Sequence, residues 1–420
     1  MYQSHSVNLS NLLLSLSDAL DLASPELSLH QMRTAFIAWE MSKAADLSRD
    51  STEQLFIAAL FHDVGALSPE DKLSLHRNEV EDVEPHCILG EAFINHVLMF
   101  EPAARIVRTH HKPWQDYGRT GMDSLIFQSQ ILCLADLVER SLDRGRYILH
   151  QGEDIVSIAG GWSSNLIHPE VVDLFRSIAD REDFWLDLVS PRLYSLLLHD
   201  GPCRGTELPI SDLVPISEMF RNLIDFRSPF TATHSSGVAA TASSIAHYLG
   251  LTETDIELME VAGNLHDLGK MAVPNSILTK PDKLTIDEFA IIRQHPYFTY
   301  SVLTTIGGMG QIAEYAAFHH ERLDGRGYPF HIDARKLNTG SRIIAVADIF
   351  TALAEDRPYR KSIGKTDVLC VLKNLSGKCH LDKNVVGILE SNYDEIIASS
   401  VKKQDKARKC YELSFQDNLA

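Results

Sequence analysis

The chain has 420 residues, of which 45% are hydrophobic and 23% are charged, a composition typical of soluble globular proteins. This length predicts two domains, and the formal net charge of −18 argues against binding to DNA, to RNA or to an acidic membrane surface. No apolar run reaches the roughly 18 residues of a membrane helix, and no secretion signal is recognisable. The six cysteines show no paired spacing. We therefore expect a cytoplasmic protein.

Helical periodicity dominates the chain, and no segment alternates polar and apolar residues as a strand would. Ser68-Pro69 is typical of a helix start, because proline fits the first helical position. Residues 252–266 predict an amphipathic helix that ends at a His-Asp pair. Thr285 and Glu288 form a capping-box pattern, which predicts the start of the helix that carries His295. The predicted fold class is all-α.

Two tandem helical bundles are predicted, with domains at 1–200 and 201–420. Apolar helical pieces between residues 181 and 225 favour a helical connector over a flexible linker. At the other end of the second domain, residues 402–409 are basic and polar. For this segment we expect a solvated, frayed end.

Histidine and aspartate recur in the same order in both halves of the chain. A lone His precedes a His-Asp pair by 32 residues in each half, and a third His precedes a His-His pair by 24 residues in each. Ten of the 19 histidines belong to this pattern. The first set consists of His30, His62, Asp63, His86, His110, His111 and Asp136. The second set consists of His234, His266, Asp267, His295, His319, His320 and Asp348.

These residue types point to a metal centre, since neutral imidazole and carboxylate are ligands of divalent transition metals. Seven ligands exceed the four of a tetrahedral zinc site and therefore fit two metals with open positions. The absence of thiolate favours Fe or Mn, with Ni or Zn as alternatives, over copper(I). The carboxylate of Asp267 can bridge two metals. On an α-helix His319 and His320 would point about 100° apart, so that each serves a different metal.

Three segments of the second half resemble the HD-GYP family of the HD phosphohydrolase superfamily. Residues 264–270 (NLHDLGK) are similar to the superfamily signature, and residues 319–329 (HHERLDGRGYP) to the H-H-E-x-x-D-G-x-G-Y-P stretch of the family. Ala347-Asp348 and residues 356–360 match its downstream segment. The resemblance covers residues 215–400. It implies metal-dependent hydrolysis of a cyclic dinucleotide, either cyclic di-GMP or mixed 3',3'-cyclic GMP-AMP, to a linear dinucleotide and further to mononucleotides.

The resemblance also implies roles for single residues. Asp267 and Lys270 are the expected catalytic residues, where a hydroxide between the two metals would attack the phosphorus in line. The expected substrate contacts are Lys270, Arg326, Tyr328, Arg357 and Arg360. The glycine-rich turn at residues 325–329 is expected to border the active site and to dock partner proteins. Phe230 stands where some family members carry a glutamate for a third metal, so we expect two metals.

Other functions remain open at this stage. A hydrolysis-dead sensor of cyclic dinucleotides that signals to partner proteins is the alternative, and the complete ligand set with Lys270 argues against it. The GYP segment disfavours a hydrolase of nucleoside triphosphates or guanosine polyphosphates. Whether the chain forms a homodimer is undecided.

The first half keeps all seven ligand positions but lacks the GYP turn. It has Ala66 where the second half has Lys270, and Arg144 and Arg146 only partly echo the downstream arginines. Three interpretations compete: a metal-bearing domain that binds or cleaves another nucleotide, a metal-binding regulatory or structural copy, and a structural remnant.

Overall fold

The structure is a computed structural model, which describes residues 6–22, 24–77, 80, 82–118, 121–227, 232–355 and 362–416. These residues form helices and one small sheet, in which strand β1 (Ser6–Asn8) pairs with strand β2 (Glu207–Pro209). The prediction of an all-α fold is confirmed. Among the described residues, no helix combines the length and the apolar character that crossing a membrane requires.

The chain divides into two compact units, and each contains one of the two His/Asp sets. The N-terminal unit comprises residues 8–66 and 70–206. The C-terminal unit runs from residue 207 onward and includes the short segments 6–7 and 67–69.

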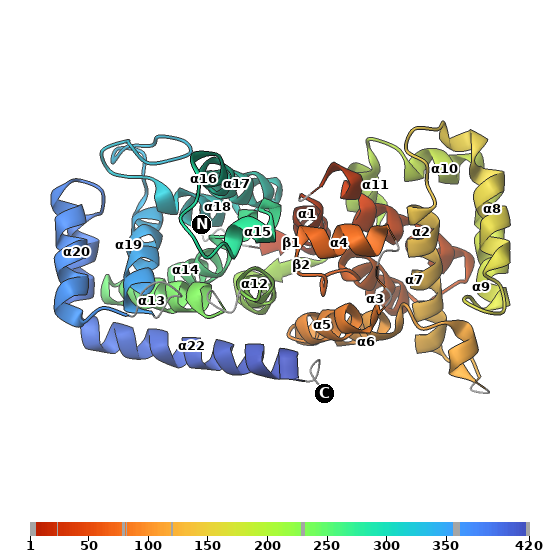
Figure 1. Ribbon diagram of the computed structural model, residues 1–420, viewed down its shortest axis with the longest axis horizontal. Coiled ribbons are helices and arrows are strands. Elements are labelled where there is room, and N and C mark those ends of the chain that lie inside the picture. Colours follow the sequence, from red (N-terminus) through yellow and green to blue (C-terminus); the bar gives the residue numbers. More distant parts are fainter. Residues whose placement is uncertain are drawn as a thin grey trace. The chain divides into compact units, whose positions relative to one another are not determined.

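The N-terminal unit is a helical bundle in which α2 packs against α3 and α7, and α5 packs against α6 (Figure 1). Fully buried phenylalanines such as Phe36, Phe56 and Phe93 fill its core. The α-helices are α1 (Leu9–Asp21), α2 (His30–Ala44), α3 (Arg49–Phe61), α4 (Pro69–His76), α5 (Glu84–Ile94), α6 (Glu101–Thr109), α7 (Ser124–Arg140), α8 (Gly152–Gly161), α9 (Pro169–Ala179), α10 (Glu182–Leu188) and α11 (Leu193–Asp200). The 3-10 helices are η1 (Pro25–Leu27), η2 (Leu98–Phe100), η3 (Trp114–Tyr117) and η4 (Ile148–His150).

The C-terminal unit is built around α13, which packs against α14, α19 and α22. Figure 1 shows α22 running alongside α13. The α-helices are α12 (Ile210–Asp225), α13 (His234–Tyr248), α14 (Glu253–Leu265), α15 (Asn275–Leu278), α16 (Ile286–Arg293), α17 (His295–Thr305), α18 (Gly310–Ala317), α19 (Thr339–Ala354), α20 (Lys365–Gly377), α21 (Lys383–Ser391) and α22 (Tyr393–Gln416). The 3-10 helices are η5 (Leu268–Ala272) and η6 (Phe318–His320).

One predicted helix boundary is wrong. The capping box of Thr285 and Glu288 exists, but the helix that it opens is α16, which ends at Arg293. His295 begins the next helix, α17. The cause is Pro296, which lacks an N–H and whose ring would collide with the carbonyl four residues earlier, whereas the first turn of a new helix tolerates it. The break places His295 at a helix start, with its ring directed into the unit. The starts of α4 at Pro69 and of α14 after Thr252 agree with the sequence.

The expectation of a frayed end is also wrong. Residues 402–409 lie inside α22, a helix of 24 residues. Ile396, Ser400, Gln404 and Ala407 recur at helical spacing on one face and are all buried. Most of the other positions between 402 and 409 are basic, so this segment has a polar sequence although one face of the helix packs against α13.

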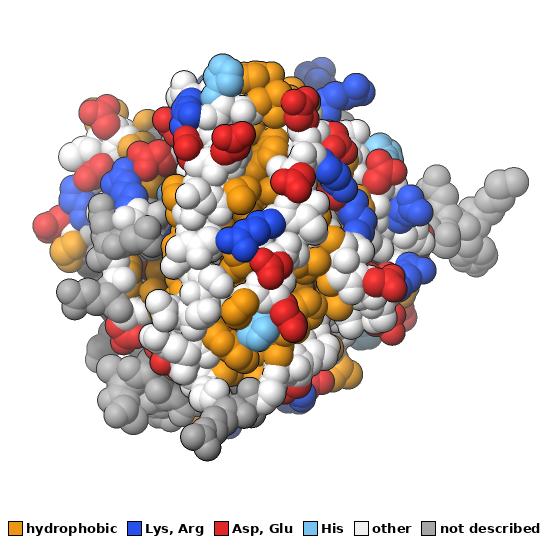
Figure 2. Space-filling model, turned by 90° about the vertical axis from the view of Figure 1, so that its right-hand side faces the viewer, with side chains coloured by type: hydrophobic (Ala, Val, Ile, Leu, Met, Phe, Trp, Pro, Cys, Tyr) orange, Lys and Arg blue, Asp and Glu red, His pale blue; other side chains and the backbone are white. Residues whose placement is uncertain are grey.

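Surface charge is mixed. On the face shown in Figure 2, acidic and basic side chains are scattered among apolar ones, and among the residues drawn in colour neither sign forms a continuous area.

Candidate metal centres

Helix ends bring the second His/Asp set together. His234 and His295 are the first residues of α13 and α17, His266 caps the end of α14, and Asp267 follows it. His319 and His320 lie in η6, and Asp348 lies in α19. All are buried except His320 and Asp348, which are partly buried. The structure therefore brings together all seven residues expected from the sequence.

Their donor atoms form two groups, each with all donors within 4.8 Å of one another: His295, His319 and His320, and His234, His266 and Asp348. Asp267 faces both, because its Oδ1 lies 3.2 Å from His295 Nε2 and its Oδ2 lies 3.3 Å from His266 Nε2. His319 and His320 belong to a 3-10 turn, in which successive side chains point about 120° apart, and not to the α-helix expected.

Backbone carbonyls fix the tautomer of several of these histidines. Nδ1 of His266, His295 and His319 lies 2.6–2.8 Å from the carbonyl oxygen three residues earlier. A carbonyl only accepts, so Nδ1 carries the proton and Nε2 presents a lone pair to the centre of the cluster. The i−3 contact arises because each histidine stands at a helix end or start, where such carbonyls have no helical partner.

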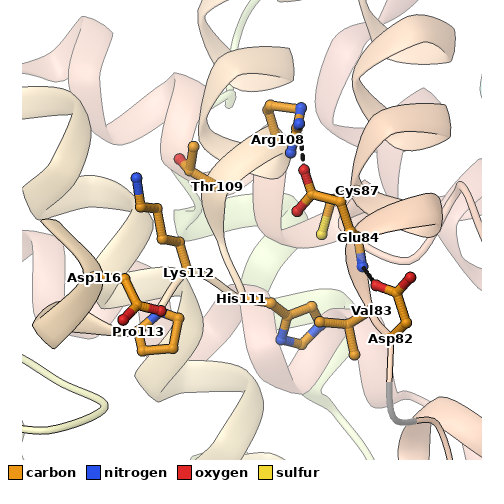
Figure 3. A pocket seen from close by; sticks show the side chains of 10 residues that line it. All are labelled: Asp82, Val83, Glu84, Cys87, Arg108, Thr109, His111, Lys112, Pro113 and Asp116. Atoms are coloured by element: carbon orange, nitrogen blue, oxygen red, sulfur yellow. Dashed lines mark hydrogen bonds and ion pairs between the residues drawn. The ribbon is translucent and has the colours of Figure 1, made fainter. Parts of the chain in front are cut away.

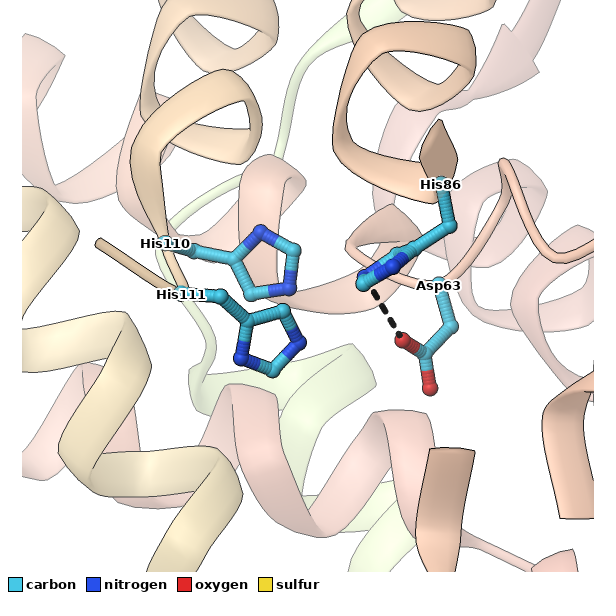
Figure 4. A group of neighbouring side chains, drawn as sticks. All are labelled: Asp63, His86, His110 and His111. Atoms are coloured by element: carbon cyan, nitrogen blue, oxygen red, sulfur yellow. Dashed lines mark ion pairs between the residues drawn. The ribbon is translucent and has the colours of Figure 1, made fainter. Parts of the chain in front are cut away.

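The N-terminal set has the same construction (Figure 4). His30 begins α2, His62 and His110 cap α3 and α6, and Nδ1 of His62 and His110 lies 2.9 and 2.6 Å from the carbonyl three residues earlier. The donor atoms of Asp63, His86, His110 and His111 lie within 4.8 Å of one another, as do those of His30, His62 and Asp63. Asp136, in α7, lies 3.6 Å from His30 and from His62.

Both sets fit divalent metals. In the N-terminal set, Nε2 of His110 is buried without a hydrogen-bond partner, and Nε2 of His30 and Nε2 of His62 each face Asp63 Oδ2 at 3.4 Å. Leaving such a nitrogen unpaired costs about 1–3 kcal/mol, and a cation would use its lone pair. Imidazole with carboxylate and no thiolate in the groups suits Fe, Mn, Ni or Zn. These His/Asp clusters can therefore hold metals.

Burial and neighbouring charges split the histidines into two classes. Burial lowers the pKa of His295 to about 3 and of His319 to about 4, so both are neutral, as metal ligands must be. Burial also acts on His234, but the carboxylates of Glu355 and Asp348 outweigh it and raise the pKa to about 10. In the N-terminal unit, burial lowers the pKa of His111 to about 4, whereas Glu139 and Asp63 overcome burial and raise that of His30.

Two glutamates were missed by sequence reasoning. Glu355 accepts a hydrogen bond from Nδ1 of His234 at 2.8 Å, and Glu139 accepts one from Nδ1 of His30 at 2.5 Å. Both follow an aspartate of the pattern, Glu139 by one helical turn after Asp136 and Glu355 by two turns after Asp348. The sequence feature that indicates them is an acidic residue on the same helix face as a candidate ligand. This feature is weak, since the distance from aspartate to glutamate along the chain differs between the halves.

The expected substrate contacts are placed as follows. Lys270 lies in η5, and its Nζ is 2.5 Å from Asp267 Oδ2, with a quarter of the side chain exposed. The ring centroids of Tyr328 and His320 lie 4.8 Å apart with the ring planes tilted by 32°, whereas Arg326 is exposed. Arg357, Arg360 and Phe230 lie outside the described residues. Of the partial echoes in the first half, Arg144 pairs with Glu139 and Arg146 pairs with Asp154.

Two further residues of the C-terminal site were not anticipated. The guanidinium of Arg293, at the end of α16, lies 4.8 Å from the ring centroid of Tyr328. Glu321 is buried and accepts hydrogen bonds from the backbone N–H groups of three residues beyond the GYP turn, Phe330, His331 and Ile332. The side chains of the neighbouring residues His320 and Glu321 thus point in different directions. His320 faces the ligand group, and Glu321 anchors the loop.

A polar cavity of about 570 Å³ adjoins the N-terminal cluster, because His111 belongs to both (Figure 3). Cys87, Arg108, Thr109 and Lys112 line it with several acidic residues. The lining carries the carboxylates of Asp82, Glu84 and Asp116 and the cations of Arg108 and Lys112, of which Arg108 pairs with Glu84.

Comparison with known proteins also finds two copies of one domain, in agreement with the two His/Asp sets. Models of the HD domain match residues 3–141 and residues 218–385. The 3'3'-cGAMP-specific phosphodiesterase 1 of Vibrio cholerae is 27% identical over 94% of this chain and 94% of its own length. The cyclic di-GMP phosphodiesterase response regulator of Xanthomonas campestris is 38% identical over 33% of this chain and 37% of its own length.

A solved structure shares the fold. The crystal structure of a cyclic GMP-AMP specific phosphodiesterase of Vibrio cholerae superposes with a TM-score of 0.62 at 22% identity, covering 93% of this chain and 98% of that one. The chain therefore belongs to the HD superfamily and is HD-GYP-like, with one HD domain in each half.

Proposed function

We propose that the chain is a metal-dependent phosphodiesterase that linearises a cyclic dinucleotide, with residues 201–420 as its catalytic domain. The observation that carries this function is the position of Asp267, whose two carboxylate oxygens face two separate groups of ligands. Such an arrangement suits a pair of metals that share one carboxylate. The HD-domain match over residues 218–385 and the names of the curated relatives supply the substrate class.

The seven residues of the second set would hold two metals, with Fe or Mn as first choice and Ni or Zn as alternatives. When bound, these metals supply positive charge to the scissile phosphate and lower the pKa of a water molecule. Fe and Mn are favoured because the ligands are imidazole and carboxylate.

Protein groups beside the ligands would bind and orient the substrate. The Lys270 ammonium lies next to Asp267 and is partly exposed, so it can donate to an oxygen of the scissile phosphate. Burial and the charges of Asp348 and Asp267 raise the pKa of Tyr328, whose hydroxyl therefore keeps its proton and can donate as well. The guanidinium of Arg293 lies 4.8 Å from the ring centroid of Tyr328, and its N–H groups can donate to a second phosphate or to a guanine. Arg326, Arg357 and Arg360 remain expected contacts.

Both cyclic di-GMP and the mixed nucleotide are candidate substrates. Two relatives that match over 94% of this chain, both from Vibrio cholerae, are named as 3'3'-cGAMP-specific phosphodiesterases, whereas relatives named for cyclic di-GMP match about half of the chain or less. We therefore propose the mixed nucleotide as the preferred substrate.

The N-terminal domain, residues 1–200, is proposed to bind metal as well. Its seven ligand positions are occupied by the same residue types, and the buried Nε2 of His110 has no hydrogen-bond partner. A residue equivalent to Lys270 is missing, since Ala66 takes that position. We assign it a metal-binding role separate from hydrolysis of the cyclic dinucleotide.

A matched pair of variants tests both statements. With Mn²⁺ or Fe²⁺ supplied, Asp267→Ala should abolish hydrolysis of both cyclic dinucleotides, whereas Asp63→Ala, the equivalent change in the first half, should retain it. Elemental analysis should find about four metals per wild-type chain, two for each centre. Undiminished cleavage by Asp267→Ala would overturn the proposed mechanism. A result of about two metals per chain would mean that the first half binds none, which contradicts its proposed metal-binding role.

The alternative, a sensor that binds a cyclic dinucleotide without cleaving it, predicts saturable binding with no linear product. We further propose a cytoplasmic location, partner proteins that dock at residues 325–329, and no role in binding DNA or RNA. Sedimentation of the full chain would decide whether it forms a homodimer.

A further inference from the structure

A line of polar contacts connects α22 with a candidate metal ligand. Gln404, on the buried face of α22, donates from Nε2 to Glu355 Oε2 at 3.2 Å. The other oxygen of that carboxylate, Oε1, accepts from Nδ1 of His234 at 2.8 Å. Helix α22 lies beyond the segment that matches the HD-domain model, which ends at residue 385.

The imidazole of His234 is held from both sides by one helix. Asp348 lies within α19, and Glu355 caps its end seven residues later, which is close to two full turns. Both carboxylates therefore face His234: Oδ1 of Asp348 is 3.1 Å from Nε2, and Oε1 of Glu355 is on the Nδ1 side. The ring orientation thus depends on where the Glu355 side chain is held.

Gly237 creates the space that Gln404 occupies. A Cβ atom at this position of α13 would lie 2.7 Å from Nε2 of Gln404 and 2.7 Å from Cγ2 of Thr351, closer than real Cβ contacts come. The amide of Gln404 therefore lies against the backbone of α13, beside α19. One turn earlier, Ser400 Oγ contacts the carbonyl oxygen of Gly237 at 3.4 Å. These contacts fix α22 against the helix that begins with His234.

We infer that Gln404 and Glu355 are positioning residues of the catalytic metal centre. The amide of Gln404 occupies one oxygen of Glu355, which leaves the other for the Nδ1–H of His234, so that Nε2 is presented to a metal. In the N-terminal unit the equivalent carboxylate, Glu139, is held by Arg33 and Arg144 at 3.4 and 3.3 Å. Among the described residues of the C-terminal unit, the neutral amide of Gln404, supplied by the C-terminal helix, contacts Glu355.

This inference rests on the proposed metal centre, and metal binding tests it. Gln404→Met in the full chain keeps the length of the side chain and removes the donor. We expect several-fold weaker Mn²⁺ binding by calorimetric titration, and a similar rise in the Mn²⁺ concentration that gives half-maximal hydrolysis. KM for the nucleotide at saturating Mn²⁺ should stay unchanged. Glu355→Gln should weaken Mn²⁺ binding more, by about 10- to 100-fold.

Lys403→Ala is the matched control, because Lys403 is the adjacent residue of α22, pairs with Glu260 at 2.9 Å and does not contact Glu355. It should leave Mn²⁺ binding unchanged. If Gln404→Met also leaves Mn²⁺ binding unchanged, or if both α22 variants weaken it equally, the inference is overturned.

A double variant guards against loss of folding. Gln404→Glu places a second carboxylate against Glu355 and should weaken Mn²⁺ binding, whereas combining it with Glu355→Gln restores one donor and one charge to the pair. Recovered Mn²⁺ binding in the double variant is the expected result, and no recovery contradicts the inference. A wild-type chain that binds Mn²⁺ but cleaves no cyclic dinucleotide would refute the proposed function and leave the titration valid.

Discussion

Glu321 should control the order of the loop that follows the GYP turn. Its buried carboxylate accepts from the N–H groups of Phe330 at 2.6 Å, His331 at 3.1 Å and Ile332 at 3.1 Å. Glu321→Ala leaves three donors without an acceptor, each costing about 1–3 kcal/mol if it stays buried. Because the loop can move and expose them to water, we expect a cost at the low end, about 3 kcal/mol in total.

Amide hydrogen exchange measures this effect locally. About 3 kcal/mol corresponds to roughly 100-fold faster exchange for residues 330–332, since every 1.4 kcal/mol is tenfold. Hydrolysis should fall as well, because Tyr328 in the same loop would leave its position beside the ring of His320. Arg335→Ala, in an exposed residue paired with Asp333, is the control and should change neither. Wild-type exchange rates in Glu321→Ala would refute the role of Glu321 as an anchor.

Three further predictions concern the C-terminal site. Gly327→Ala should lower kcat/KM by about 100-fold, because its Cβ would lie 2.4 Å from the Cα of Glu321 and the loop must shift by about 1 Å. The control is Gly307→Ala, where an added Cβ has nothing within 4 Å, and it should match the wild type in the same assay. Arg293→Ala should raise KM for the cyclic dinucleotide about tenfold, which corresponds to roughly 1.4 kcal/mol of binding free energy. It should not slow cleavage of bis(p-nitrophenyl) phosphate, which offers neither a base nor a second phosphate. Equal losses on both substrates would contradict substrate binding by Arg293. The pKa of metal-free His234 is raised to about 10, so below that pH a metal must displace the proton of His234. Mn²⁺ affinity should therefore rise about tenfold per pH unit between pH 7 and 9, and calorimetry in buffers of different ionisation enthalpy should detect the released proton. A pH-independent Mn²⁺ affinity would contradict this displacement.

Much of the site could be predicted from the sequence because the same order of His and Asp occurs in both halves of the chain. The 32- and 24-residue spacings identified fourteen ligand candidates, and the structure brings each set of seven together. Apolar periodicity located α14, and the capping-box pattern located the start of α16, since such a cap depends only on residues three positions apart. The capping box alone assigned His295 to α16, but Pro296 ends that helix and places His295 at the start of α17.

The order and spacing of residue types were enough to predict the all-α fold, the two His/Asp sets and the chemistry of their donors. Tertiary packing, in contrast, sets which oxygen of Asp267 faces which histidine and which groups hold His30 and His234. Glu139 lies 109 residues from His30, and Gln404 lies 49 residues from Glu355. Neither distance follows from a helical period, because contacts between helices depend on how the whole unit packs. The same packing makes the polar segment 402–409 part of a helix that buries one face, with Gln404 and Ala407, against α13.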